Sequence, residues 1–178
     1  MEQVVLVDEF DNPVGLMEKM EAHKKGVLHR AFSLLIYNSK GELMIQKRAQ
    51  HKYHSPNLWT NTCCSHPRPN ESLLKAAERR AYEELGLLCA PQYGFSFIYK
   101  TEFSNGLVEY ELDHVLTAVY EGDVEINEEE ASDWKFISMY DLKLDVELNP
   151  DNYTYWFKVI LEHPNFDQLT TRYQQLAG

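Results

Sequence analysis

The chain has 178 residues and a net charge of −11, and 44% of its residues are hydrophobic. This length fits one domain with a core of its own, and no stretch reaches the roughly 20 apolar residues that span a bilayer. The acidic balance excludes nonspecific nucleic-acid binding, because a phosphate backbone is bound by clusters of lysine and arginine. We therefore expect a soluble globular protein without a nucleic-acid or membrane partner.

The cysteines and the N-terminus bear on the compartment. The first residues show neither a basic region followed by an apolar run nor an Arg/Ser-rich amphipathic stretch, so no export or organelle signal is visible. Cys63, Cys64 and Cys89 are an odd number and two of them are adjacent, which does not suit a disulfide framework. Free thiols fit a reducing compartment, and we expect a cytoplasmic protein.

The first half of the chain predicts strands followed by one helix. Residues 4–7 read as a strand and 11–15 as a turn, while residues 31–37 and 42–48 flank 38–41 as a hairpin. From residue 72 the apolar residues recur at helical spacing, with Asn70 or Ser72 as the N-cap and Gly86 at the end. We expect a helix of about four turns.

The second half predicts further strands and a second helix. Residues 93, 95, 97 and 99 are aromatic and alternate, and residues 109–120 are rich in β-formers, so two strands should flank a turn at 104–106. Residues 134–137 predict a short strand. Pro150 should open a helix whose apolar face ends before Pro164. The acidic run 128–130 is typical of solvated surface.

Residues 71–87 resemble the Nudix box. Glu71 is followed at the box spacing by Arg79 and by the sequence Glu-Glu-Leu-Gly-Leu at 83–87. Ser65 stands where the pattern has glycine, and Arg80 replaces a glutamate, which disfavours nucleoside diphosphate hydrolysis. The alternative interpretation is a helix with surface ion pairs, since residues 79 and 83, like 80 and 84, are four apart.

A more specific resemblance lies upstream. Residues 59–67 read Trp-Thr-Asn-Thr-Cys-Cys-Ser-His-Pro, and together with Glu-Tyr-Glu at 109–111 they resemble the type I isopentenyl diphosphate isomerases, divergent members of the Nudix fold. The resemblance runs from about residue 18 to 160. It implies an α/β (α+β) fold, a mixed sheet sandwiched between helices, as a single domain over 1–178 with its Nudix core at about 27–161. It also implies interconversion of isopentenyl and dimethylallyl diphosphate, in isoprenoid biosynthesis.

The chain offers a set of metal ligands. Glu109, Glu111 and Asp113 are two residues apart, so in a strand they share one face, and three histidines could join them. Such a mixed shell suits Mn²⁺, Zn²⁺ or Fe²⁺, with Mg²⁺ less natural for three imidazoles. The resemblance assigns the site to His23, His29, His66, Glu109 and Glu111. It assigns a second ion, Mg²⁺ bridged to the substrate diphosphate, to Glu84. The other histidines, His51, His54, His114 and His163, are interpreted as ordinary surface or core residues.

Moving a double bond requires an acid and a base on opposite faces of the substrate. The resemblance implies that Cys64, rather than Cys63, and Glu111 fill these roles, with Tyr99 relaying a proton to or from Glu111. Which of the two groups protonates the alkene is left open. Trp156 would cover the pocket and stabilise the carbocation, the alternative being an ordinary core aromatic.

The substrate is an anion, so cations must bind it. The resemblance places Lys19, Arg48 and Lys52 at the diphosphate, with a hydroxyl or amide from Ser65 and with Arg80 as a weaker candidate. We expect a small-molecule diphosphate as the only partner and a monomer, with a weak dimer as the alternative.

Two other functions compete. A Nudix hydrolase would need a glutamate in place of Arg80 and has no use for Cys64 beside three histidines. A catalytically inactive metal-binding module should have lost part of the acid, base or ligand set, and none of it is lost in this sequence.

Overall fold

The computed structural model describes residues 2–176, and the strands in this range form one nine-stranded mixed sheet. In chain order the strands and helices are β1 (Gln3–Val7), β2 (Pro13–Glu18), α1 (Lys19–Lys25), β3 (His29–Tyr37), β4 (Leu43–Arg48), β5 (Trp59–Thr60), β6 (Cys63–Ser65), α2 (Leu73–Leu85), β7 (Gln92–Glu102), β8 (Val108–Val119), β9 (Ala131–Ile137), α3 (Met139–Leu148), a 3₁₀ turn (Pro150–Asn152), α4 (Tyr155–Glu162) and α5 (Pro164–Leu176).

Strand β3 is the centre of the sheet. It pairs in parallel with β8 along its whole length and in antiparallel with β6 through residues 32–34. The predicted hairpin between β3 and β4 has its turn, but the expected pairing along the two strands is wrong. The two strands share a single antiparallel pair, Tyr37–Leu43. Residues 32–34 on the edge of β3 that faces β4 are taken by β6, and β4 pairs mainly with β9 and β5.

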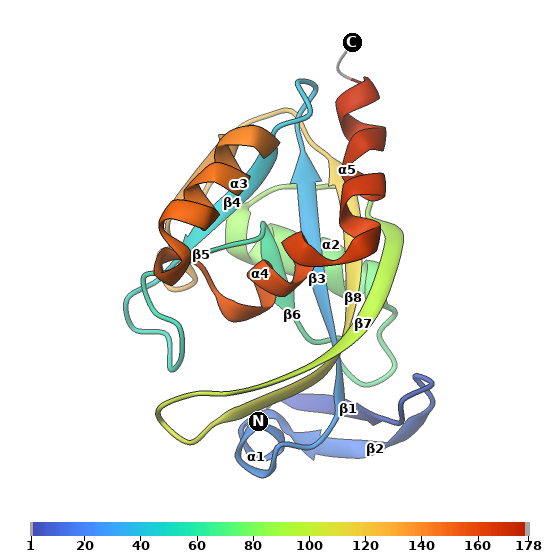
Figure 1. Ribbon diagram of the computed structural model, residues 1–178. Coiled ribbons are helices and arrows are strands. Elements are labelled where there is room, and N and C mark those ends of the chain that lie inside the picture. The colour runs from blue at the N-terminus through green and yellow to red at the C-terminus, as the bar shows by residue number, and fades with distance from the viewer. Residues whose placement is uncertain (1, 177–178) are drawn as a thin grey trace.

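Helices cover both faces of the sheet, as predicted (Figure 1). On one face, α2 packs its buried Ala76, Ala77 and Leu85 onto β3 and β8. On the other face, α4 and α5 supply Phe157 and Phe166 to a second apolar cluster. This is the predicted α/β (α+β) sandwich, and the sheet divides these two clusters. Within residues 2–176 a third, smaller cluster contains Val5, Val7, Leu28 and Leu112.

Helix α2 has the predicted ends. The Ser72 hydroxyl accepts from the Lys75 amide at its start, and Gly86 closes it in the left-handed region with a φ of 66°. The buried residues lie on one side of the helix. The one charged residue among them is Glu84, which lines a pocket together with Arg80.

Near the N-terminus the predicted turn lies a few residues too late. The Asp8 carboxylate accepts from the amides of Phe10 and Asn12, which closes the turn there. Pro13 and Gly15 already belong to β2, which is paired with β1. Proline is tolerated because it is the first residue of an edge strand.

The aromatic alternation in β7 is interrupted. A register shift falls between Tyr93 and Phe95, so Tyr93 is exposed while Phe95 is buried. Gly94 lies in this bulge, where an added Cβ would come 3.0 Å from the Val115 carbonyl oxygen. Bulges place two residues opposite one and so break the alternation of faces.

The C-terminal region contains more helix than predicted. Pro150 opens only a 3₁₀ turn, and α4 begins after Thr154. It ends before Pro164 as predicted, but Pro164 then starts α5. Helices α1, α3 and α5 were not expected. None of the helices within residues 2–176 is long and apolar enough to cross a bilayer.

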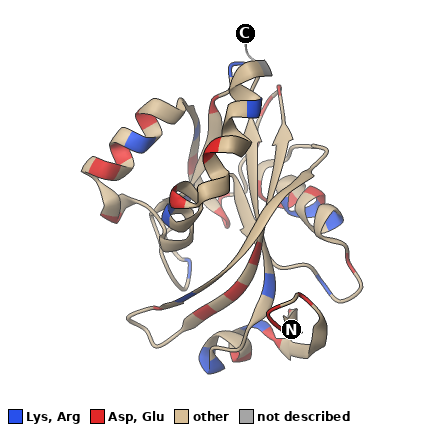
Figure 2. Ribbon diagram, turned by 45° about the vertical axis from the view of Figure 1, so that its right-hand side comes forward, with Lys and Arg blue, Asp and Glu red and all other residues tan. Residues whose placement is uncertain are grey.

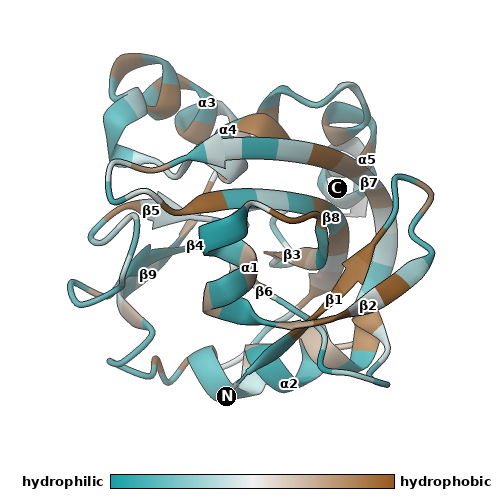
Figure 3. Cartoon of the chain, turned by 90° about the horizontal axis from the view of Figure 1, so that it is seen from below, coloured by the Kyte–Doolittle hydropathy of each residue, from teal (hydrophilic) through white to brown (hydrophobic). Residues whose placement is uncertain are grey.

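Within residues 2–176, one end of the sheet is covered by a strand hairpin and one short helix. The β1–β2 hairpin and α1 lie at this end, below β3, β7 and β8 in Figure 1. Figure 3 looks onto it and shows the mostly hydrophilic α1 in front of the strand ends. Polar side chains from several elements meet here.

Candidate active site

A pocket opens at this end of the sheet and brings together most of the predicted site residues. Acidic residues band the long β7–β8 hairpin beside it (Figure 2). Its lining includes the predicted catalytic, diphosphate-binding and ligand residues Lys19, Arg48, Lys52, Cys64, Ser65, His66, Arg80, Glu84, Tyr99, Glu109, Glu111 and Trp156. His23 and His29 are outside the lining and lie beside Glu111.

The two adjacent cysteines face opposite sides of β6. Cys64 lines the pocket and is half-buried, whereas Cys63 is fully buried and packs into the cluster under α2. This follows from the alternation of side chains along a strand. Burial raises the pKa of the Cys64 thiol, so the group is an uncharged S–H at neutral pH.

Glu111 faces three imidazoles. Its Oε1 lies 3.0 Å from Nε2 of His66, 3.4 Å from that of His29 and 3.8 Å from that of His23. All four residues are buried, and their ligand atoms lie within 4.8 Å of one another. They come from α1, β3, β8 and the segment after β6, so the fold rather than a local motif assembles them.

These residues fit a divalent ion. The Nδ1–H of His29 donates to the Val27 carbonyl over 2.8 Å, which leaves the Nε2 lone pair directed at the cluster. Within residues 2–176, Nε2 of His29 and of His23 are buried without a hydrogen-bond partner. Burial lowers the pKa of His66 to about 4, so its ring is neutral and able to bind a metal.

Glu109 lies beside this cluster rather than within the group of four. The Tyr99 hydroxyl lies 3.0 Å from Oε2 of Glu109 and 2.8 Å from Oε2 of Glu111, so one proton is shared between two carboxylates. Burial, with the charge of Glu111, raises the pKa of Glu109 well above its usual value. Burial would also raise the pKa of Glu111, but the three imidazoles hold it well below the usual range.

His54 was interpreted as an ordinary residue, and the structure places it in the pocket wall. Its Nε2 lies 3.2 Å from Oε1 of Glu109, and its ring stacks on Phe103. Burial, with the neighbouring Arg48, lowers the pKa of His54 to about 3. The only sequence signal was its place in the loop between Arg48 and β5, two residues after Lys52.

The predicted diphosphate cations are each engaged by protein groups. Lys19 pairs with Glu2 at 2.8 Å, and Lys52 pairs with Glu130. Glu130 was predicted to be solvated surface, which is wrong because it also lies 3.1 Å from Arg80 and is partly buried. The acidic run 128–130 lies in the turn directly before β9. Of its three carboxylates, that of Glu130 lines the pocket, whereas Glu128 and Glu129 are exposed.

Arg48 and Trp156 lie against each other on the far wall. The guanidinium carbon is 5.2 Å from the indole centroid, and the group donates to the carbonyls of His54 and Ser55. The indole is 2% exposed, and its Nε1–H donates to Oδ1 of Asn61 over 3.2 Å. Asn61, from the Trp-Thr-Asn-Thr motif, therefore fixes the orientation of the indole.

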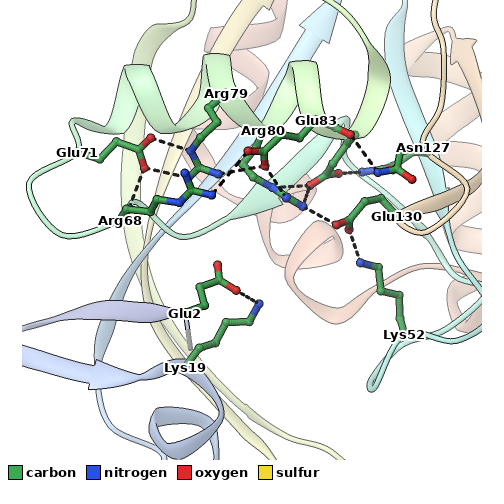
Figure 4. Close-up of polar contacts among 12 residues, drawn as sticks. Glu2, Lys19, Lys52, Arg68, Glu71, Arg79, Arg80, Glu83, Asn127 and Glu130 are labelled. Atoms are coloured by element: carbon green, nitrogen blue, oxygen red, sulfur yellow. Dashed lines mark hydrogen bonds and ion pairs between the residues drawn. The ribbon is translucent and has the colours of Figure 1, made fainter.

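Helix α2 presents a dense set of ion pairs (Figure 4). Arg79 binds both oxygens of Glu71 at 2.7 and 2.9 Å, and Arg80 pairs with Glu83 and Glu84. The ion pairs expected from helical spacing are therefore present. Glu84 also accepts from Nε2 of Gln46 over 2.8 Å, so both of its oxygens are occupied.

Comparisons with known proteins identify the family of this chain. A NUDIX domain model matches residues 27–157. The chain is 48% identical over 161 residues to "Isopentenyl-diphosphate Delta-isomerase 2" of Aromatoleum aromaticum, covering 90% of this chain and 85% of that protein. It is 48% identical over 157 residues to "Isopentenyl-diphosphate Delta-isomerase" of Pectobacterium atrosepticum, covering 88% of each.

The fold is also found among solved structures. The crystal structure of DR0079 from Deinococcus radiodurans superposes with a TM-score of 0.71 at 19% identity, over 96% of this chain and 98% of that one. Such a low identity supports the fold alone, whereas the sequence relatives are similar along nearly their whole length. The chain therefore belongs to the isopentenyl-diphosphate Delta-isomerases of the Nudix superfamily.

Proposed function

We propose that this chain interconverts isopentenyl and dimethylallyl diphosphate, with Cys64 and Glu111 as the two proton-transferring groups. The observation that carries the proposal is that a thiol from β6 and a carboxylate from β8 line the same pocket as several cations. The relatives named as isopentenyl-diphosphate Delta-isomerases support the choice of substrate. The product would feed isoprenoid synthesis.

The reaction is balanced by one proton in and one proton out. Protonation of the terminal methylene carbon leaves a tertiary cation at its neighbour, and loss of a proton from the next carbon forms the allylic double bond. The C–O bond to the diphosphate stays intact and no water is consumed. Cys64 acts at one of these carbons and Glu111 at the other, and each reverses its role when the reaction runs backward.

Tyr99 is the proposed relay to Glu111, since its hydroxyl reaches the oxygens of both Glu111 and Glu109. Trp156 is proposed to wall off the cation from water and to stabilise it with its π face. The buried indole and its hydrogen bond to Asn61 support this role. Four residues, Lys19, Arg48, Lys52 and Ser65, are proposed to hold the diphosphate, with Arg80 as a weaker candidate in the same pocket lining.

We propose that His23, His29, His66 and Glu111, joined by Glu109, hold a divalent ion. Three imidazoles favour Mn²⁺ or Zn²⁺ over Mg²⁺. A cation there would favour the ionised form of Glu111 and make its protonated form the stronger acid. Glu84 is proposed to hold Mg²⁺ together with the substrate diphosphate.

The proposal also includes a monomeric, cytoplasmic enzyme made of one domain over residues 1–178. Gel filtration with light scattering tests the monomer, and a dimer at micromolar concentration would contradict it.

The activity is tested by incubating the purified protein with isopentenyl diphosphate and Mg²⁺ plus Mn²⁺. Allylic diphosphates are acid-labile, so the expected result is a time-dependent, acid-labile product that Cys64→Ala does not form. If the metal-loaded wild type formed no such product, the proposed function would be wrong.

A further inference from the structure

His54, in the loop 49–58 between β4 and β5, lies beside a carboxylate of the proposed metal centre. Its side chain is 6% exposed, and its Nε2 lies 3.2 Å from Oε1 of Glu109, whose side chain is 7% exposed. The Tyr99 hydroxyl donates to the other oxygen, Oε2, over 3.0 Å. The carboxylate of Glu109 is therefore contacted at one oxygen from the loop and at the other from β7.

The imidazole of His54 is itself held in place. It stacks on the Phe103 ring with the centroids 4.7 Å apart and the planes 25° apart, and it meets the Trp156 ring edge-on at 5.7 Å. The backbone carbonyl of His54 accepts from the Arg48 guanidinium over 3.2 Å. Because both the ring and the backbone are fixed, His54 is able to keep a neighbouring carboxylate in one orientation.

The contacts of the ring indicate which nitrogen faces Glu109 with a hydrogen. The Ser55 hydroxyl lies 3.4 Å from Nδ1, and a hydroxyl can donate as well as accept. An ionised carboxylate only accepts. A hydrogen on Nε2 therefore serves Glu109 and leaves Nδ1 to accept from Ser55.

Glu109 needs such support more than the other proposed ligands do. The ligand atoms of His23, His29, His66 and Glu111 lie within 4.8 Å of one another, whereas Glu109 lies beside this group. Carboxylates that bind metals are themselves oriented by hydrogen-bonding partners, and loss of such a partner typically costs about 10- to 100-fold in metal affinity or activity.

We propose that His54 is a positioning residue that holds Glu109 in the orientation in which it completes the shell of the divalent ion. His54 thereby raises the affinity of the chain for that ion without binding it. The inference rests on the metal centre put forward under the proposed function.

The test measures the dissociation constant of Mn²⁺ alone for the metal-stripped chain, without substrate, from the electron paramagnetic resonance signal of free Mn²⁺. His54→Ala is expected to raise this Kd by about 10-fold or more. His54→Phe keeps a ring against Phe103 but lacks the nitrogens, and it should raise the Kd as much. His54→Gln keeps an N–H donor and should recover most of the affinity.

His51→Ala is the matched control, because His51 belongs to the same loop, has 56% of its side chain exposed and pairs with Glu129. Its Kd should equal that of the wild type. A second comparison uses Glu109→Ala, which removes the carboxylate that His54 contacts. In that background the further change His54→Ala should leave the Kd unaltered, because coupled residues do not contribute additively.

An unchanged Kd in a folded His54→Ala would overturn the inference and leave the proposed metal centre intact. Equal losses from His54→Ala with and without the Glu109 carboxylate would also overturn it, since His54 would then act on the fold and not through Glu109. If His54→Ala does not fold, His54→Phe decides in the same way. A wild type that binds no Mn²⁺ would overturn the metal centre and this inference with it.

Discussion

Cys64→Ala separates chemistry from structure most clearly. The change removes a thiol that lines the pocket and leaves the pairing of β6 with β3 intact. Loss of a general acid or base lowers the rate by roughly 10²- to 10⁴-fold, which is about 3–5 kcal/mol of barrier. The cavity left by one half-buried sulfur costs about 0.5 kcal/mol of unfolding free energy. The expected shift in Tm is therefore only about 1–2 °C.

Cys63→Ala is the matched control with the opposite outcome. Cys63 is fully buried against α2 and faces away from the pocket. We expect about 1 kcal/mol of lost stability and a kcat within about threefold of wild type. Steady-state kinetics with isopentenyl diphosphate and thermal melts of both variants provide the comparison. A Cys64→Ala enzyme with more than about a tenth of the wild-type kcat would refute the role of the thiol.

Three further outcomes are expected. Glu111→Gln should lower kcat more than Glu109→Gln at saturating Mn²⁺, because only Glu111 is proposed to transfer a proton; equal residual kcat would leave Glu111 a ligand only. Tyr99→Phe removes the hydroxyl shared by both carboxylates and should lower kcat by roughly 10-fold or more with KM nearly unchanged, and an unaltered kcat would exclude the relay. Neither the wild type nor Arg80→Glu should hydrolyse ADP-ribose, dinucleoside polyphosphates or oxidised GTP, because the acid and base are aimed at carbon; robust phosphate or nucleotide release would favour the hydrolase alternative.

The parts of the fold that local patterns determine could be predicted. The helix over Leu73–Leu85 has its Ser72 cap and Gly86 terminus, and the strands around the 104–106 turn are present. The β3–β4 hairpin could not be judged locally, because the competing partner β6 lies almost thirty residues further along the chain. The bulge at Gly94 likewise depends on packing against Val115 and α5.

The candidate site divides in the same way. Residues carried by separated motifs, such as Cys64, His66 and Glu111, meet in one region as expected. The positions of His54 and Glu130 in the pocket wall were missed because they depend on contacts with residues distant in sequence, namely Glu109 and Arg80. A histidine or an acidic run carries no local signal that distinguishes a pocket wall from a solvated surface.

The most direct test of the account is the isomerisation of unlabelled isopentenyl diphosphate in D₂O, followed by NMR of the dimethylallyl product at early times. Two separate groups that exchange with solvent predict one deuterium in the newly formed methyl group. They also predict loss of one of the two hydrogens of the chain carbon on the other side of the cationic carbon. Dimethylallyl diphosphate formed without deuterium in that methyl group would contradict the account, because the same proton would then have been moved within the substrate.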